Sequence, residues 1–276
     1  MPKFPICYDD RKEIGNTGEK VSAIGLGTWN IRNPSAAIEA LAYAVERGID
    51  NIDTAEMYGD GAAEEIVGEV IKRVGRDRVF ITTKLLPHRF RSKELAERAL
   101  KASLKRLNVK YVDLVLIHWP DSLTSIESQI RSLEFLAERG LTRYIGVSNF
   151  DLLLLKEAVE ATRKHDIVVD QVKYSVAYKQ PENRLLPFAI ERKITIQAYT
   201  PIERGQVAAS SVLKKLGEKY NKTPVQVALN YLIARPRVIA IPKTEKKERV
   251  EEFIGAMGWR LSPEDIEMLE SITSLI

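Results

Sequence analysis

The stretch Asn51-Ile52-Asp53-Thr54-Ala55-Glu56-Met57-Tyr58-Gly59 begins with a short apolar run and ends on polar and ionisable side chains. The same pattern returns in Ile81-Thr82-Thr83-Lys84 and in Leu116-Ile117-His118-Trp119-Pro120. A buried parallel strand whose carboxyl end opens into a site has this pattern. The three stretches therefore predict strands that bring a carboxylate, a phenol, an ammonium and an imidazole together.

Strand-like apolar runs recur along the chain and mostly alternate with amphipathic, helix-like stretches. We expect eight strands, at residues 23–26, 51–53, 79–84, 112–118, 144–147, 170–173, 195–198 and 238–241. Helix-capping residues such as Ser92 and Asp151 stand between them, and one of the expected helices spans residues 182–191. Eight strands followed by helices predict a (β/α)8 TIM barrel, and residues 11–22 predict an N-terminal β-hairpin turning at Gly15-Asn16-Thr17-Gly18. No linker interrupts the pattern, so we expect one domain spanning residues 1–276.

An open, doubly wound sheet is the main alternative fold for an alternating chain. That fold prefers a Gly-x-Gly-x-x-Gly turn after its first strand, where a dinucleotide binds. Here the first strand leads into Gly25-Leu26-Gly27-Thr28-Trp29-Asn30, so asparagine stands where the last glycine would be. The sequence therefore favours the barrel.

The charge and the cysteine content exclude several classes of protein. The chain has 42 Lys and Arg against 38 Asp and Glu, a net charge of +4 without a dense basic run, which argues against nucleic-acid binding. Cys7 is the single cysteine, so no internal disulfide can form, as is usual in the cytosol. The three histidines are widely spaced and make a poor ligand set, so we expect no metal.

The hydropathy pattern argues against a membrane protein. No run approaches the ~18 apolar residues of a membrane-spanning helix. The start, Met1-Pro2-Lys3-Phe4-Pro5, lacks the long apolar segment of a signal peptide. We therefore expect a cytoplasmic protein with a small-molecule partner, and the sequence leaves the oligomeric state open.

Polar or ionisable side chains stand within a few residues of the end of every predicted strand. They are Thr28, Asp53, Lys84, His118, Ser148, Asn149, Gln171, Tyr199 and Lys243. For any single residue of this set, a place in a solvated loop is about as good an interpretation as a place in a functional site. In a barrel, however, all strand carboxyl ends share one face. The recurrence at every strand therefore favours one common site.

Part of this set, together with Tyr58, has the chemistry needed to reduce a carbonyl group. The reduction needs a proton for the oxygen as hydride reaches the carbon, and free tyrosine, with a pKa of about 10, is a weak acid at neutral pH. A nearby ammonium such as Lys84 would lower that pKa, and Asp53 would keep Lys84 charged and aimed. His118 would donate a hydrogen bond to the carbonyl oxygen, although a lone histidine at a strand end can also be a core residue.

Seven stretches, in this order on consecutive strand ends, resemble the aldo-keto reductase family across essentially the whole chain. They are Gly25-Leu26-Gly27-Thr28-Trp29, Asp53-Thr54-Ala55-Glu56-Met57-Tyr58-Gly59, Thr83-Lys84, His118-Trp119-Pro120, Gly146-Val147-Ser148-Asn149-Phe150, Gln197-Ala198-Tyr199-Thr200-Pro201 and Ile241-Pro242-Lys243-Thr244. Each stretch is a weak signal alone, and together they are specific. The resemblance implies reversible, NADP(H)-dependent reduction of aldehydes and ketones to alcohols.

The resemblance also implies roles for individual residues. The catalytic tetrad would be Asp53, Tyr58, Lys84 and His118. The cofactor-binding residues would be Thr28, Ser148, Asn149, Gln171, Tyr199, Thr200, Lys243, Thr244 and Arg249. Within that set, Ser148, Asn149 and Gln171 would hold the nicotinamide carboxamide, and Tyr199 would stack on its ring. Lys243, Thr244 and Arg249 would bind the 2′-phosphate, and Trp29 and Trp119 would be aromatic walls of the substrate pocket.

Three positions depart from the family pattern. The family often has serine where this chain has Thr200 and Thr244, and asparagine where it has Phe253. A hydroxyl remains at the first two positions, whereas Phe253 cannot supply the adenine contact that the asparagine makes.

Two other functions fit parts of the sequence. A cofactor-binding regulatory subunit of the same fold would carry a further docking segment, and the sequence has none that we recognise. A barrel enzyme acting on phosphate-bearing substrates would place a glycine-rich cradle after the seventh or eighth strand. Here Lys243-Thr244-Glu245-Lys246-Lys247 follows the eighth strand without glycine. The sequence therefore favours the reductase.

Overall fold

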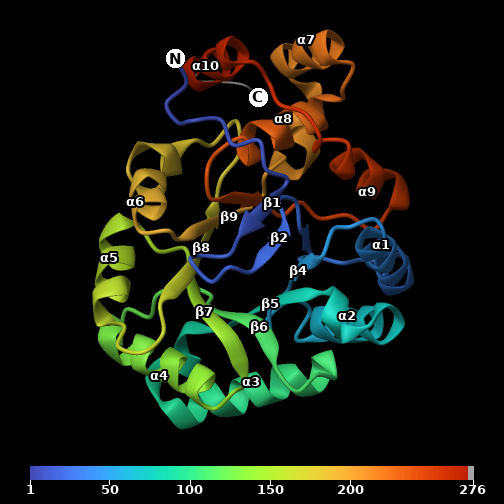
Figure 1. Cartoon of the computed structure of the whole chain (residues 1–276). Coiled ribbons are helices and arrows are strands. Elements are labelled where there is room, and N and C mark those ends of the chain that lie inside the picture. Colours follow the sequence, from blue (N-terminus) through green and yellow to red (C-terminus); the bar gives the residue numbers. More distant parts are fainter. Residues whose placement is uncertain (273–276) are drawn as a thin grey trace.

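The computed structural model describes residues 1–272, and its centre is a sheet of eight parallel strands (Figure 1). These strands are β3 (Leu26–Gly27), β4 (Asn51–Asp53), β5 (Phe80–Leu85), β6 (Val112–Ile117), β7 (Thr142–Ser148), β8 (Ile167–Lys173), β9 (Thr195–Tyr199) and β10 (Val238–Ala240). Each strand pairs with its neighbours in sequence. Isolated parallel bridges from Ile24 to Ala240 and from Gly27 to Lys243 join the first and last strands, so the sheet closes on itself.

Helices surround the strands on the outside (Figure 1). The α-helices are α1 (Pro34–Glu46), α2 (Ala62–Val74), α3 (Lys93–Leu107), α4 (Ile126–Glu138), α5 (Leu152–Ala161), α6 (Leu185–Glu191), α7 (Ser211–Tyr220), α8 (Pro224–Ile233), α9 (Lys247–Ile254) and α10 (Pro263–Ser271). Short 3-10 helices are η1 (Arg76–Arg78), η2 (Pro87–Arg91), η3 (Gln180–Asn183) and η4 (Glu203–Ala209). The alternation of strands and helices confirms the predicted (β/α)8 barrel.

Local sequence signals account for most helix starts. Ser92 and Asp151 cap α3 and α5, because their side chains accept hydrogen bonds from the backbone amides of Leu95 and Leu154. The helix expected at residues 182–191 is divided instead. Arg184, at φ −143° and ψ −37°, leaves the helical region, so η3 ends before it and α6 begins after it.

The predicted hairpin is confirmed and covers the amino end of the barrel. Strands β1 (Arg11–Glu13) and β2 (Lys20–Ser22) pair antiparallel. Gly15, in the turn between them, has φ +56°, and a β-carbon there would lie 2.7 Å from Cβ of Val168. Glycine therefore lets the turn lie directly on the barrel floor.

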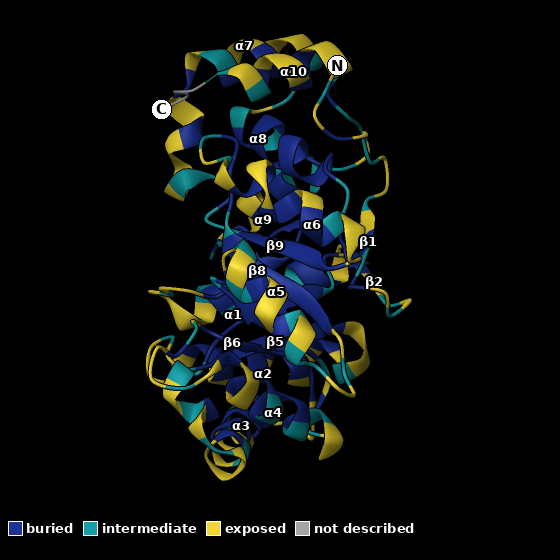
Figure 2. Ribbon diagram, turned by 90° about the vertical axis from the view of Figure 1, so that its left-hand side faces the viewer, coloured by how far each residue is buried: buried dark blue, intermediate teal, exposed yellow. Residues whose placement is uncertain are grey.

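The buried apolar residues form two clusters. The small one lies inside the barrel, where Ile14 and Val21 of the hairpin pack with strand residues such as Phe80, Leu114 and Ile239. The large one fills the layer between the strands and the helices, so the strands are buried on both faces (Figure 2). This double burial explains why the strands are rich in apolar residues along their whole length.

Within residues 1–272, no helix is both long enough and apolar enough to cross a membrane.

Candidate active site

A buried ion pair joins the carboxyl ends of β4 and β5. Lys84 Nζ donates to Asp53 Oδ1 at 2.6 Å and to Asp53 Oδ2 at 2.8 Å, and also to the carbonyl oxygen of Thr54 at 2.9 Å. Lys84 is only 1% exposed. Burial alone would lower the pKa of its ammonium, but the attraction of Asp53 and Tyr58 outweighs burial and raises that pKa. Lys84 therefore stays charged at neutral pH.

Tyr58 lies in the loop after β4, and Lys84 approaches its ring. Lys84 Nζ is 4.8 Å from the ring centre. The pKa of the phenol differs from the sequence-based expectation, because burial raises it and Lys84 only partly opposes that rise. Tyr58 is therefore a protonated phenol at neutral pH, the form that a proton donor requires.

His118, at the end of β6, completes the group. Its ring meets the Tyr58 ring edge-on, with the centroids 5.7 Å apart, and stacks on Trp119 with the centroids 4.0 Å apart. Burial first, and Lys84 second, lower the pKa of His118 to about 3. The imidazole is therefore neutral at physiological pH and carries one N–H that can donate to a carbonyl oxygen. Its Nδ1 atom is buried and has no hydrogen-bond partner among residues 1–272.

The residues expected to hold a carboxamide lie beside these groups. Gln171 Nε2 donates to Asp53 Oδ1 at 2.7 Å, which links β8 to the Asp53–Lys84 pair. Ser148 Oγ donates to the carbonyl oxygen of Gln171 at 2.8 Å. Asn149 Nδ2 donates to the carbonyl oxygen of His118 at 3.0 Å. The structure thus brings all three residues into one hydrogen-bonded network with Asp53, Lys84 and the backbone of His118, and Tyr58 lies against that network through its ring.

Tyr199, Thr28 and Thr200 lie around the same network. The Tyr199 hydroxyl donates to Asn149 Oδ1 at 2.8 Å, which fixes the half-buried ring at the end of β9. Thr28 Oγ1 donates to the carbonyl oxygen of Asp53 at 3.0 Å. Thr200 has φ +53°, where the chain turns sharply after β9. The Thr28 hydroxyl therefore has a protein partner already and supports the backbone beneath the ion pair.

The predicted phosphate-binding residues form a second group, which follows β10 and extends into α9. Lys243 pairs with Glu245, whose carboxylate also accepts from the backbone amides of Arg32 and Asn33 at 3.0 and 2.9 Å. Arg249, on the exposed side of α9, pairs with Glu252.

Two further residues of this segment have local structural roles. Thr244 Oγ1 accepts from the backbone amide of Lys246 at 3.1 Å, just before α9 begins. Phe253 is buried in the outer core. Lys243 and Arg249, the two cations predicted to bind phosphate, thus each have an acidic partner, and Phe253 is a packing residue of α9.

Trp29 and Trp119, which were predicted to be walls of the substrate pocket, lie at the protein surface at the carboxyl end of the barrel. Trp29 is 49% exposed and Trp119 is 39% exposed. The guanidinium of Arg204, from η4 after β9, lies 5.2 Å from the centre of the Trp29 ring. The two tryptophans are therefore accessible to a small molecule that approaches His118 and Tyr58.

Three residues near the site were missed by the sequence analysis. Gln197 accepts from Gln171 Nε2 at 3.0 Å and pairs with it in register across β8 and β9. Thr54 contributes the carbonyl oxygen that binds Lys84. Asp170 precedes Gln171, is fully buried, and has no hydrogen-bond partner for either carboxylate oxygen among residues 1–272. Polar residues inside otherwise apolar strands were the signal for Gln197 and Asp170.

Arranged in this way, the site can deliver a proton and orient a carbonyl group. It offers a protonated phenol beside a fixed ammonium and a neutral imidazole, with an amide-rich wall next to them. In the described part of the chain, no three His, Cys, Asp or Glu side chains are grouped so that they could hold a metal ion.

The chain is similar to known proteins in both sequence and fold. The sequence pattern of the Aldo/keto reductase family matches residues 23–274. A methylglyoxal reductase, YeaE, of Escherichia coli is 32% identical, with 94% of each chain covered. A glyoxal reductase of Bacillus subtilis is 33% identical over 98% of this chain and 95% of that protein.

Solved structures agree with this result. A thermostable aldo-keto reductase, Tm1743, solved with the inhibitor epalrestat, is 37% identical with a TM-score of 0.88, covering 95% of this chain and 98% of that one. An aldo/keto reductase of Klebsiella pneumoniae, solved with NADP and acetate, is 32% identical with a TM-score of 0.89, covering 95% and 94%. The chain belongs to the aldo/keto reductase family.

Proposed function

We propose that the protein reduces aldehydes and ketones to alcohols with NADPH, and catalyses the reverse reaction with NADP⁺. The observation that carries the proposal is the position of Tyr58, a protonated phenol whose ring lies 4.8 Å from the buried ammonium of Lys84. Asp53 holds that ammonium with two hydrogen bonds. A reductase needs such a proton donor, since the carbonyl oxygen gains negative charge as hydride arrives.

The cofactor, when bound, supplies the hydride that is added to the carbonyl carbon. The chain's own residues control the oxygen. His118, neutral and held against Trp119, donates a hydrogen bond that orients the carbonyl. Tyr58 then gives its proton to that oxygen, and the Lys84 ammonium stabilises the phenolate that remains. In the reverse direction, the phenolate of Tyr58 accepts the proton of an alcohol.

The donor set suits a nicotinamide cofactor. Ser148, Asn149 and Gln171 offer amide and hydroxyl groups in one network, which matches the hydrogen-bonding groups of a carboxamide. The Tyr199 ring is held next to them by its bond to Asn149. These four residues would hold the nicotinamide end, close to Tyr58 and His118.

NADP(H), rather than NAD(H), suits the other end of the site. Lys243 and Arg249 are cations, and Thr244 adds a hydroxyl, the groups that recognise a 2′-phosphate. The Klebsiella pneumoniae relatives were solved with NADP and with NADPH. A 2′-phosphate would have to share Lys243 and Arg249 with Glu245 and Glu252.

Small reactive aldehydes are the substrate class that the relatives suggest, since two of them are a methylglyoxal reductase and a glyoxal reductase. Two exposed tryptophans would form the walls of an open pocket that admits such molecules.

Steady-state oxidation of NADPH by a panel of aldehydes and ketones tests the proposal. We expect turnover with small aldehydes, weaker turnover with NADH, and formation of the corresponding alcohol. Cofactor binding without turnover of any carbonyl compound would support the alternative, a cofactor-binding regulatory subunit of the same fold. Absence of NADPH binding would refute both functions.

A further inference from the structure

The loop after β9 presents a cation at the mouth of the site without giving it a counter-ion. Arg204 is exposed, and none of the described residues 1–272 places a carboxylate within ion-pair distance of its guanidinium. The guanidinium lies 5.2 Å from the centre of the Trp29 ring, which is within the range of a cation–π interaction. A charge held in place but not neutralised is available to a ligand.

The backbone is shaped to place Arg204 there. Glu203, Arg204 and Gly205 have successive positive φ angles of 44°, 54° and 93°. Such a run is unusual, because positive φ is sterically unfavourable for residues other than glycine. Strain of this kind persists only where neighbouring contacts enforce it.

Glu203 supplies those contacts. Its Oε1 accepts from Ser175 Oγ at 2.6 Å, and its Oε2 lies 3.4 Å from Nζ of Lys173. The carboxylate is thereby fixed to the end of β8 and is not available to the arginine that follows it. The anchored Glu203 therefore positions Arg204 over Trp29, two strands away across the mouth of the barrel.

Two other acids on the same face, Glu56 and Glu245, also have partners within the protein. Glu56 accepts from the backbone amide of Leu86 at 2.7 Å and pairs with Arg89 at 3.2 Å. Glu245 pairs with Lys243 and caps two backbone amides. Among the described residues at the mouth of the barrel, the Arg204 guanidinium thus has no counter-ion, whereas the carboxylates of Glu56 and Glu245 already have hydrogen-bond and ion-pair partners.

We propose that Arg204 and Trp29 together select carbonyl substrates that carry a carboxylate at the end remote from the carbonyl group. This inference rests on the proposed reductase function. The apolar spacer of the substrate would lie on the Trp29 ring, and its carboxylate would pair with the guanidinium, which forms planar, two-pronged hydrogen bonds with carboxylates. Aldehyde acids such as 4-carboxybenzaldehyde belong to this class.

A matched pair of substrates tests the assignment. The probes are 4-carboxybenzaldehyde and its neutral methyl ester, compared with wild type, Arg204→Met and Arg204→Lys at saturating NADPH. We expect Arg204→Met to lower kcat/KM for the acid about tenfold, as the loss of one charge-assisted hydrogen bond at a solvated site would. The ester should change little, and Arg204→Lys should recover part of the loss. Arg32→Met, which removes another exposed cation on the Trp29 loop, is the control and should not separate acid from ester.

Two further measurements separate the possible outcomes. Fluorescence titration of NADPH against wild type and Arg204→Met should give equal dissociation constants. A weaker NADPH affinity with no separation of acid from ester would assign the guanidinium to the cofactor pyrophosphate and overturn the inference. Equal losses for both probes would also overturn it.

Binding of the product 4-(hydroxymethyl)benzoate to the complex with NADP⁺ provides a readout without turnover. It should weaken in Arg204→Met, whereas binding of its methyl ester should not. Lack of turnover of every carbonyl compound refutes the proposed reductase, while this binding comparison still decides the role of Arg204.

Discussion

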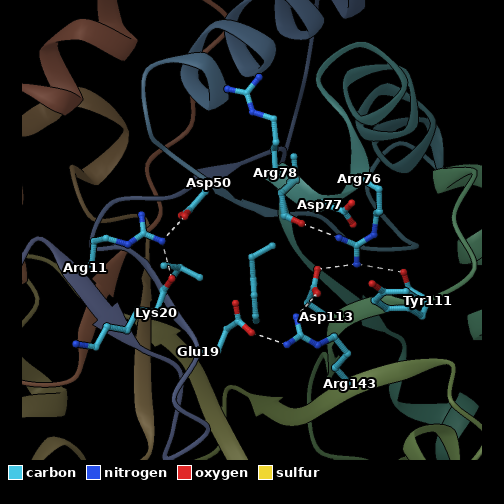
Figure 3. Close-up of a pocket in the computed structure, with 13 residues that line it drawn as sticks. Arg11, Glu19, Lys20, Asp50, Arg76, Asp77, Arg78, Tyr111, Asp113 and Arg143 are labelled. Atoms are coloured by element: carbon cyan, nitrogen blue, oxygen red, sulfur yellow. Dashed lines mark hydrogen bonds and ion pairs between the residues drawn. The ribbon is translucent and has the colours of Figure 1, made fainter.

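The two ends of the barrel both hold clusters of charged side chains, and they use them differently. At the amino end, beneath the hairpin, Asp113 accepts from Arg76 at 2.7 Å, from Arg143 at 3.0 Å and from the backbone amide of Ile81 at 2.8 Å (Figure 3). Arg11 pairs there with Asp50. These ion pairs surround a cavity of about 280 Å³. Most charges at this end thus have an opposite charge as partner.

At the carboxyl end, several polar groups lack such partners. The Nδ1 atom of His118 has no hydrogen-bond partner in the described residues, and the guanidinium of Arg204 contacts an aromatic ring rather than an acid. At the amino end, the Nε atom of Arg76 is a comparable case among residues 1–272. An exposed group that has no counter-ion in the described part of the protein, such as the Arg204 guanidinium, is available to a ligand. This availability separates the proposed reactive end from the structural one more clearly than charge density does.

Tyr58→Phe should give the largest effect on the carboxyl end. The substitution keeps the ring and removes the proton, and general acid catalysis contributes typically ~100- to 10,000-fold. We expect kcat to fall by that order, with cofactor affinity and thermal stability nearly unchanged. The measurement is kcat with NADPH and with its deuterated form, which shows whether hydride transfer limits the rate. A variant that keeps most of the wild-type kcat while hydride transfer is limiting removes Tyr58 from the role.

Lys84→Met should damage both activity and stability. The loss of the ammonium weakens the support for the Tyr58 phenolate, so kcat should fall by about 100-fold, the lower end of general acid catalysis. It also leaves Asp53 as a buried charge without its partner, which costs about 3–5 kcal/mol. The double variant Asp53→Asn/Lys84→Met should regain much of the stability and none of the activity. Urea denaturation and kcat, measured on the same samples, separate the two effects, and full activity at neutral pH would contradict the assignment.

Asp113→Asn should have the opposite profile at the amino end. It leaves Arg76 and Arg143 without their shared carboxylate, and the partial exposure of both arginines limits the cost to about 2–3 kcal/mol of unfolding free energy. Since the residue is at the far end of the barrel, kcat should stay within about twofold of wild type. Lys101→Met, which breaks an exposed pair on α3, is the control and should cost less than about 1 kcal/mol. A large loss of activity in Asp113→Asn would break the division between the two ends.

Asp170→Asn tests a buried carboxyl group that belongs to neither cluster. Burial raises the pKa of Asp170 well above its usual value, and the nearby backbone amide of Phe150 only partly opposes this. The folded state therefore binds the proton more tightly than the unfolded state, and stability falls as pH rises from about 4 through the folded pKa. Asparagine mimics the neutral acid, so the variant should gain melting temperature relative to wild type as pH increases from 4 to 8. A constant difference over that range would show that Asp170 does not titrate between the two states.

The fold could be predicted because its signals are local and repeated. The apolar runs, the capping residues and the glycine turn of the hairpin each depend on neighbouring residues, so the eight strands were found despite shifts at their ends. The boundary at Arg184 was missed because its backbone angles are not encoded by a proline or glycine at that residue. Strand β8 starts at Ile167, earlier than expected, because its first residues pair with β7.

The site could be predicted in part. The positions of Asp53, Lys84 and His118 follow from the rule that strand ends meet at one face of a barrel. The partners of Lys243 and Arg249 could not be predicted, because a sequence does not say which of several nearby acids a long side chain reaches. The net direction of the Tyr58 pKa was missed for a related reason. The balance between burial and one ammonium depends on depths and distances that only the structure gives.

Arg249→Ala should give the smallest of these effects and tests the outer part of the carboxyl end. Arg249 pairs with Glu252, which Thr223 also holds through a hydrogen bond of 2.7 Å. A 2′-phosphate would have to compete with that carboxylate for the exposed guanidinium. We therefore expect NADPH to bind about tenfold more weakly in Arg249→Ala, the lower end of what one charge-assisted hydrogen bond contributes, with NADH binding nearly unchanged.

The pair itself supplies the control for this last prediction. Glu252→Gln keeps the size of the side chain and frees the guanidinium of Arg249, so it should strengthen NADPH binding and leave NADH binding alone. Fluorescence titration of both cofactors against the three proteins decides the matter. If Arg249→Ala weakens both cofactors equally, or neither, Arg249 is a solvated residue of α9 whose pairing with Glu252 is structural. If the two variants move NADPH affinity in opposite directions, the arginine is a phosphate ligand whose strength the neighbouring acid limits.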